Sequence, residues 1–446
     1  MARPRRHLVT TCLLGLVILG LVGVLAVNVL LGSVLRQLSN GRLEGADYWT
    51  SEPEILSAGM GFDNIIGLPA TDEEAVREAG GAWSPECETT SAASVTTVER
   101  AYVGSGVDHD DGLPVVFSWP VATETVDPAD FRFTLNTGDT VVAHAAGMNP
   151  NWENGERNTV VLFGDFGNRL PSSDPDAVFP VRLEIVEDDT PLLLVGPEGE
   201  VDAVGLTWTT QTSPYDAGPV LVGAKLNRVG DEAVGEGGVT LLERSGVLPN
   251  DELALYDEHD FRLRVLTSGG FSPDGVTGLQ PDMFEDFFRI RAGDVVLDEV
   301  GVDYQVAGGT LRVVGLSDLG QRQDSYDACY LEDRDNYIDI VLAGDEAAAR
   351  SITAVEIPAL EGGYSAFYNP GGPGPAPFDG VTYTAPGPPD LEPVTIALDD
   401  PMRVSRDATA NGMLLPIATV VAAAVGGLAL VWLFWIRPRG GRGSSG

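Results

Sequence analysis

The middle of the chain is a succession of short apolar or alternating segments, each bounded by Gly, Pro, Asp or Asn. Alternation with a period of two between turn residues is typical of half-buried β-strands. The segments with this pattern are 113–121, 131–135, 158–164, 179–186, 205–211, 219–226, 261–266, 310–316, 336–342 and 352–358. Many short strands with such punctuation predict a mainly β chain of β-sandwich architecture.

Helical periodicity is scarce. Residues 71–80 (TDEEAVREAG) predict one short helix, because Thr71 and Glu74 form a capping box and two glycines end the pattern. We expect a second short helix at 344–352 and a helical turn at 281–288.

An internal repeat divides the strand-rich region. Residues 165–174 (DFGNRLPSSD) and 318–327 (DLGQRQDSYD) share Asp, Gly, Arg, Ser and Asp at matching places. Upstream, 130–139 (DFRFTLNTGD) matches 286–294 (DFFRIRAGD) at a nearly constant offset. The repeat predicts two related sandwich modules in tandem.

The stretch 115–135 (VVFSWPVATETVDPADFRFTL) resembles the SbsA-type bacterial immunoglobulin-like module, in which a strand ends at a Ser-x-Pro-Val turn and a second strand follows a Thr-Val pair. The residues that carry the resemblance are Phe117, Ser118, Pro120, Val121, Thr125, Val126, Phe131 and Phe133. The second copy departs from the pattern, since Phe271, Ser272 and Pro273 lack the spacing. The resemblance implies extracellular, non-catalytic modules that act as spacers or in adhesion.

Two uncharged segments, 8–35 and 413–436, flank the strand-rich region. Each is long enough to cross about 30 Å of hydrocarbon as a helix. Arginines precede the first segment and follow the second, so the positive-inside rule predicts two contacts with membrane lipid and cytoplasmic termini. A cleaved signal peptide is the alternative for the first segment.

The charge balance is strongly acidic, with a formal net charge of −39 and an isoelectric point near 4.2. Lys225 is the only lysine, and every other basic residue is arginine. This composition resembles that of proteins from salt-loving archaea. At molar salt the Debye length is about 3 Å, so surface carboxylates repel one another little. Nucleic acid is not an expected partner, because it requires a basic face.

The stretch 332–342 (EDRDNYIDIVL) is the strongest candidate for a metal site. Calcium takes carboxylate and amide oxygens crowded in one loop. The candidate ligands are Asp333, Asp335, Asn336 and Asp339. The strand half of the stretch also matches 179–183 in the first copy, so acidic surface leading into a strand is the alternative. Asp108, Asp110 and Asp111 form a second acidic cluster with the same two interpretations.

Cys87 and Cys329 are the two cysteines between the uncharged segments. Outside the cell they would form a disulfide, and the alternative is two buried thiols. Motifs for a catalytic serine or cysteine, for zinc and for phosphate binding are absent from the sequence.

We therefore expect a mainly β protein in which two tandem immunoglobulin-like β-sandwich modules lie outside the membrane, flanked by N- and C-terminal transmembrane helices. The expected divisions are a cytoplasmic N-terminus 1–7, a transmembrane helix or uncleaved signal anchor 8–35, a juxtamembrane segment 36–95, module one 96–230, module two 231–367, a Pro/Gly-rich stalk 368–412, a transmembrane helix 413–436 and a cytoplasmic tail 437–446.

The function that these features favour is binding, adhesion or envelope organisation at the cell surface, with a surface protein or a glycan as partner. The alternatives are an ecto-hydrolase that uses carboxylates and an accessory subunit of a membrane complex. Calcium is the one cofactor that the residues suggest.

Overall fold

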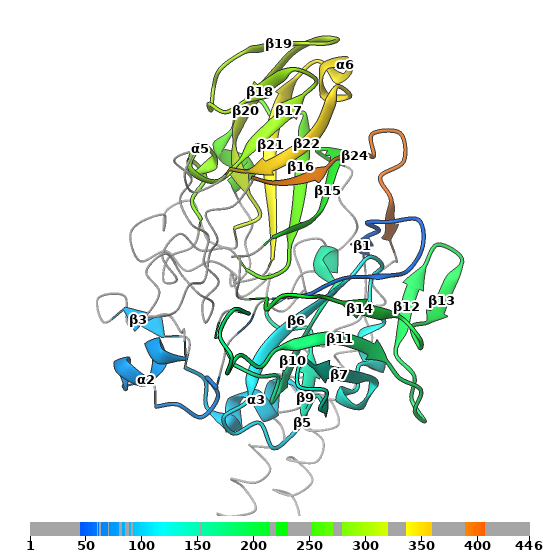
Figure 1. The fold of residues 1–446 in the computed structure, drawn as a ribbon. Coiled ribbons are helices and arrows are strands. Elements are labelled where there is room, and N and C mark those ends of the chain that lie inside the picture. The colour runs from blue at the N-terminus through cyan, green and yellow to red at the C-terminus, as the bar shows by residue number, and fades with distance from the viewer. Residues whose placement is uncertain are drawn as a thin grey trace, which may run out of the picture. The chain divides into compact units, whose positions relative to one another are not determined.

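A computed structural model describes residues 45–59, 61, 64–69, 71–79, 83–84, 89–90, 92–151, 154–168, 170, 172–214, 220–230, 252–270, 279–319, 336–358 and 389–405. Regular structure in these residues is dominated by antiparallel β-sheets (Figure 1), which confirms the mainly β prediction. All ten predicted strand segments contain an observed strand.

The first pair of sheets, which we call unit A, has five strands in one sheet and four in the other. The five-stranded order is β2 (Ile55–Ala58), β6 (Asp111–Phe117), β10 (Thr159–Gly164), β9 (Ala145–Gly147) and β5 (Val103–Gly104). The four-stranded order is β14 (Thr207–Thr209), β11 (Pro180–Ile185), β7 (Phe131–Leu135) and β8 (Thr140–Val142). Apolar residues at alternate positions of both sheets, including Phe117, Phe131 and Leu162, form one core between them.

The second pair of sheets, unit B, has six strands in one sheet and four in the other. The six-stranded order is β19 (Tyr304–Val306), β20 (Gly309–Ser317), β21 (Tyr337–Gly344), β16 (Phe261–Thr267), β15 (Leu221–Arg228) and β24 (Thr395–Ile396). The four-stranded order is β18 (Val295–Leu297), β17 (Arg289–Ala292), β22 (Ile352–Ile357) and β23 (Asp390–Pro393). Leu263, Ile340 and Val355 belong to the core between these two sheets.

The two units share one strand order. The order β2-β6-β10-β9 corresponds to β15-β16-β21-β20, and β14-β11-β7-β8 corresponds to β23-β22-β17-β18. Strands that correspond also follow one another along the chain in the same sequence. The matched segments 130–139 and 286–294 form equivalent hairpins, β7–β8 and β17–β18, whose turns contain Gly138 (φ 90°) and Gly293 (φ 62°).

Beyond these hairpins, the sequence match was wrong, because it paired strands that do not correspond. The sequence match set residues 338–342 against 179–183, whereas the sheet orders make β21 the counterpart of β10 and β22 the counterpart of β11. The matched segments 165–174 and 318–327 follow β10 and β20, which do not correspond. Each contains a residue with positive φ, Gly167 (135°) and Asp318 (67°), but the sequence match sets Asp318 against Asp165 and does not align these two positions.

Short elements complete the described residues. The three predicted helices are confirmed as α2 (Glu73–Glu78), α5 (Phe284–Phe287) and α6 (Glu346–Ala349), and α3 (Val95–Ala101) was not predicted. Paired strands outside the main sheets are β1 (Gly45–Asp47) with β25 (Arg403–Ser405), β3 (Trp83–Ser84) with β4 (Thr89–Thr90), and β12 (Leu193–Gly196) with β13 (Gly199–Asp202). The 3₁₀ helices are η1 (Thr123–Thr125), η2 (Pro128–Asp130), η3 (Asn154–Glu156) and η4 (Glu252–Leu255).

Several strands lie across the divisions expected from the sequence. β2 belongs to unit A although it falls in the expected juxtamembrane segment, and β15 belongs to unit B although it precedes residue 231. β23 and β24 come from the expected stalk and pair with strands of unit B. Both expected membrane spans lie outside the described residues, and the described residues contain no helix long and apolar enough to cross a membrane.

Candidate functional site

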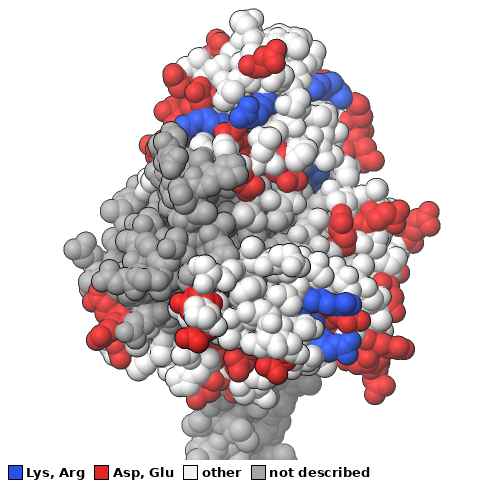
Figure 2. All heavy atoms as spheres, in the orientation of Figure 1, with Lys and Arg blue, Asp and Glu red and all other residues white. Residues whose placement is uncertain are grey.

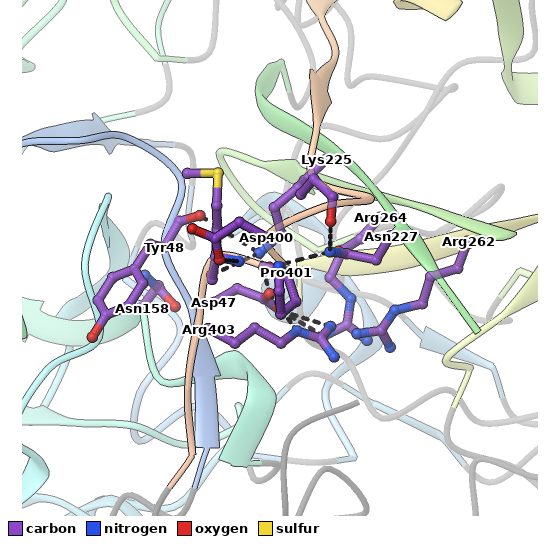
Figure 3. Close-up of polar contacts among 12 residues, drawn as sticks. Asp47, Tyr48, Asn158, Lys225, Asn227, Arg262, Arg264, Asp400, Pro401 and Arg403 are labelled. Carbon is purple, nitrogen blue, oxygen red and sulfur yellow. Dashed lines mark hydrogen bonds and ion pairs between the residues drawn. The ribbon is translucent and has the colours of Figure 1, made fainter. Parts of the chain in front are cut away.

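A buried cluster of charged side chains lies where β1 and β25 meet the six-stranded sheet of unit B (Figure 3). Its centre is Asp47 of β1. Nζ of Lys225, on β15, is in direct contact with Oδ1 of Asp47. Nε of Arg403, on β25, donates to the same oxygen at 2.7 Å, and Nη1 of Arg264, on β16, lies 3.5 Å from Oδ2.

Arg264 extends the cluster across the sheet. Its Nε donates to Oδ1 of Asp339 at 2.8 Å, and its Nη2 donates to Oδ2 of Asp318 at 2.7 Å. Arg262 adds a second ion pair to Asp339, at 3.2 Å. One continuous network therefore joins β1, β25, β15, β16 and β21.

The cluster is almost completely removed from solvent. The side chains of Asp47, Lys225 and Arg264 are at most 1% exposed, and that of Arg403 is 3% exposed. Burying an ion costs several kcal/mol unless an opposite charge and hydrogen bonds compensate it. Removal of one partner from such a network is therefore far more destabilising than removal of an exposed charge.

The sheet register explains why these charges need one another. Lys225 lies directly opposite Arg264 on the neighbouring strand, and Arg264 lies directly opposite Asp339 on the next. Two like charges opposite each other on one face of a sheet repel. Asp47 contacts both Lys225 and Arg264, and so it supplies the negative charge that this pair requires.

Titration follows from burial and the neighbouring charges. Burial by itself would raise the pKa of Asp47, but the positive charges of Lys225, Arg403 and Arg264 outweigh it and hold that pKa well below its usual range. Burial lowers the pKa of Lys225 to about 8, although Asp47 opposes this shift.

Aromatic side chains close the cluster. The Trp49 ring lies 5.4 Å from Nζ of Lys225, and the Tyr337 ring lies 5.6 Å from Cζ of Arg264. Trp49 and Tyr337 pack together with Val116 of unit A and Leu266 of unit B. The cluster therefore adjoins the contact between the two units.

The segment after β1 connects this cluster to unit A. Trp49 N–H donates to the Ser118 carbonyl at 2.9 Å, and Nε1 of Trp119 donates to the Thr50 carbonyl at 2.9 Å. Oγ of Ser118 also donates to the Glu52 carbonyl at 3.1 Å. Residues 47–52 thus contact unit A through backbone hydrogen bonds and unit B through the Asp47 side chain.

Two of the four candidate calcium ligands have defined positions. Asp339 pairs with Arg262 and Arg264, as described above. Oδ1 of Asn336 accepts hydrogen bonds from Nδ2 of Asn151 at 2.9 Å and Oγ1 of Thr159 at 3.1 Å. Asn336 therefore links unit B to unit A. Asp333 and Asp335 lie outside the described residues, and the calcium site stays a prediction.

The second acidic cluster fastens loops of unit A. Oδ2 of Asp111 accepts from the backbone N–H groups of Phe166 (2.6 Å) and Gly167 (3.0 Å). Asp110 pairs with Nδ1 of His144 at 2.9 Å. Within the described ranges, no group of three or more His, Cys, Asp or Glu side chains is placed to hold a metal ion.

An open hollow of about 250 Å³ at the other end of unit B contains the carboxylates of Glu258, Asp303 and Asp345. Nε of Arg312 donates to Asp303 at 2.7 Å, and its Nη1 donates to Glu258 at 3.1 Å. Oδ2 of Asp345 accepts the backbone N–H of Thr310 at 2.8 Å. Each of these carboxylates thus has a structural partner.

The sequence contained one signal for the ionic cluster. Lysine occurs once in a chain that otherwise uses arginine, and that lysine is the residue in contact with Asp47. Asp47 itself had no signal, because it lies 178 residues from Lys225 in a segment expected to be juxtamembrane. Cys87 and Cys329 lie outside the described residues, so their disulfide stays a prediction.

Comparison with known proteins identifies no relative: no family model, no curated protein and no solved structure matches this chain.

Proposed function

We propose that this chain is a membrane-anchored surface protein of a halophile, in which two tandem immunoglobulin-like β-sandwich modules act in binding, adhesion or envelope organisation. Units A and B are the two modules. The uncharged segments 8–35 and 413–436 are the anchors, and both termini are cytoplasmic.

The pairing of β1 with β25 is the observation that carries this proposal. Gly45 is the register partner of Ser405, and Asp47 is the partner of Arg403. The two places where the chain continues toward the uncharged segments are therefore adjacent, and the strands run in opposite directions. This arrangement suits an ectodomain inserted between two membrane helices, because the chain leaves the membrane and returns to it.

The surface charge supports the proposal that the protein works at high salt. Acidic side chains are spread over the face drawn in Figure 2, and basic side chains occupy only a few places on it. At molar salt this surface stays hydrated, with little repulsion between neighbouring carboxylates. In dilute buffer the same charges would repel one another and destabilise the folded state.

The test is external protease digestion of intact cells in molar salt, with an epitope tag added after residue 446. External protease should degrade the region 37–412 and leave the tagged tail intact. Protection of that region until the membrane is permeabilised would contradict the proposal. Permeabilised cells, in which the tail is also lost, are the control.

A truncation tests the first anchor separately. A chain that ends at residue 412 lacks the second uncharged segment and should stay in the membrane fraction through residues 8–35. Release of the truncated ectodomain into the medium would show that the first segment is a cleaved signal peptide. That outcome would leave a single anchor and refute the two-pass arrangement.

A further inference from the structure

We propose that Lys225 and Asp47 are joined by an amide bond between Nζ and Cγ, which crosslinks β1 to β15. This modification goes beyond the surface role proposed above. Three features carry it: the use of lysine at this position alone, the direct contact of its amine with one carboxylate, and the near-complete burial of both groups.

The presence of lysine and not arginine at position 225 points to the chemistry of an amine. Arg262, Arg264 and Arg403 show that guanidinium groups serve the ion pairs of this cluster. A guanidinium stays protonated and is a poor nucleophile, whereas a buried lysine loses its proton readily. Burial lowers the pKa of Lys225 to about 8, which gives access to the neutral amine.

The reaction is a condensation that needs no co-reactant. Transfer of one proton from Nζ to the carboxylate that it contacts is uphill, because the cations around Asp47 hold the pKa of its carboxyl low, and it transiently gives amine and carboxylic acid. The Nζ lone pair then adds to Cγ, and one carboxyl oxygen leaves as water with the transferred proton and one further proton from nitrogen. The product amide keeps the last proton on Nζ, and one positive and one negative charge disappear together.

Two surrounding groups are placed to assist the addition and to accept a hydrogen bond from the product. Arg403 donates to Oδ1 of Asp47 through Nε at 2.7 Å and to Oδ2 through Nη2 at 3.3 Å. These donors stabilise the negative oxygen of the tetrahedral intermediate. The Met402 carbonyl lies 3.2 Å from Nζ, in reach of the N–H that the product retains.

Burial and fixed geometry favour the product over the ion pair. Reacting groups held in contact reach effective molarities of about 10⁵ M or more. Exclusion of water slows the reverse hydrolysis. The crosslink would join residues 178 positions apart and fasten the strand nearest the first uncharged segment to unit B.

Peptide mass spectrometry of the full-length protein tests the bond. Cleavage at arginine yields the peptides 43–77, with Asp47, and 183–228, with Lys225. We expect one branched species with the summed mass of both peptides less one water. Trypsin should also fail to cut after Lys225, because an acylated amine is not recognised. Recovery of two unlinked peptides, with tryptic release of 226–228, would overturn the proposal.

Two variants supply the controls. Lys225→Arg keeps the positive charge without an acylable amine, and Asp47→Ala removes the carboxyl group. Both should give only unlinked peptides from these regions. A branched species in either variant would show that other residues form the bond. Because the wild-type protein decides the question alone, a folding defect in a variant leaves the test intact.

Discussion

Units A and B have the same strand order. They differ in what covers the face of the larger sheet that points away from the sandwich core. In unit A, Val161 and Phe163 of β10 pack beneath an apolar layer that includes Val98 and Tyr102. In unit B, the corresponding face carries Lys225, Arg264 and Asp339 within the ionic cluster. One sheet topology thus accepts an apolar or an ionic cover, and the side chains of the covering segment decide which.

The difference has consequences for specificity. Apolar contacts tolerate small shifts in position, whereas a buried charge requires its partner at a defined place. The ionic cover therefore suits the place where β1 and β25, the first and last strands of the described residues, pair in one register. We infer that the cluster positions β1 and β25, and that the apolar cover of unit A mainly contributes stability.

The largest expected effect follows from Arg264→Ala. This change removes the guanidinium that binds Asp339 and Asp318 and leaves buried carboxylates without that partner. The free energy of unfolding should fall by about 3–5 kcal/mol. Denaturant titration at fixed molar salt measures it, and a loss below about 1 kcal/mol would show that the cluster is not energetically coupled.

Val161→Ala makes the comparison in unit A, at a sheet residue beneath the apolar cover. Val161 is 8% exposed, and the variant loses buried methyl groups and leaves a small cavity. The free energy of unfolding should fall by about 2 kcal/mol. A loss as large as that of Arg264→Ala, in the same titration, would remove the distinction between the two covers.

Much of unit B could be predicted from its strands, but the ionic cover could not. The alternation in residues 261–266 agrees with the position of Phe261, Leu263 and Val265 in the core. The same alternation suggests that Arg262 and Arg264 face solvent, yet both are buried. Their partner Asp47 comes from a distant two-stranded sheet, and local periodicity contains no information about such a contact.

The internal repeat also shows that local sequence contains little information about long-range pairing. The matched segments 130–139 and 286–294 do form equivalent hairpins, β7–β8 and β17–β18, because a tight turn constrains its own few residues. The segments 165–174 and 318–327 also match in sequence, although they follow strands that do not correspond. Only long-range pairing distinguishes their places, so the sequence match misaligned β21 with β11.

A smaller, pH-dependent effect is expected from Asp130 in unit A. Burial, with the charges of Asp188 and Asp127, raises its pKa from 3.8 to about 7. The folded protein therefore holds this proton more tightly than the unfolded chain, and its stabilising contribution below pH 4 is lost as the pH rises through 7. Between pH 4 and pH 7 the melting temperature of Asp130→Asn should fall less than that of the wild type. Parallel plots of melting temperature against pH would refute the raised pKa of Asp130.

The smallest effect is expected from Arg132→Ala. Nη2 of Arg132 lies 2.9 Å from Oε2 of Glu184 on the outer face of unit A, and both side chains are substantially exposed. Exposed ion pairs contribute little, and molar salt screens them further. The unfolding midpoint should match that of the wild type within replicate error. A clear decrease would show that exposed pairs also stabilise this protein.

Hydrogen exchange of the full-length protein tests the central claim, that the ionic cluster holds β1 and β25 against the sheet of unit B. The backbone amides of β1 and β25 that pair with each other should exchange as slowly as those of β16 in the wild type. In Asp47→Ala, which lacks the carboxylate that Lys225, Arg264 and Arg403 contact, they should exchange much faster, while the paired amides of β7 in unit A stay protected. Fast exchange of β1 and β25 in the wild type, with β16 protected, would contradict the account.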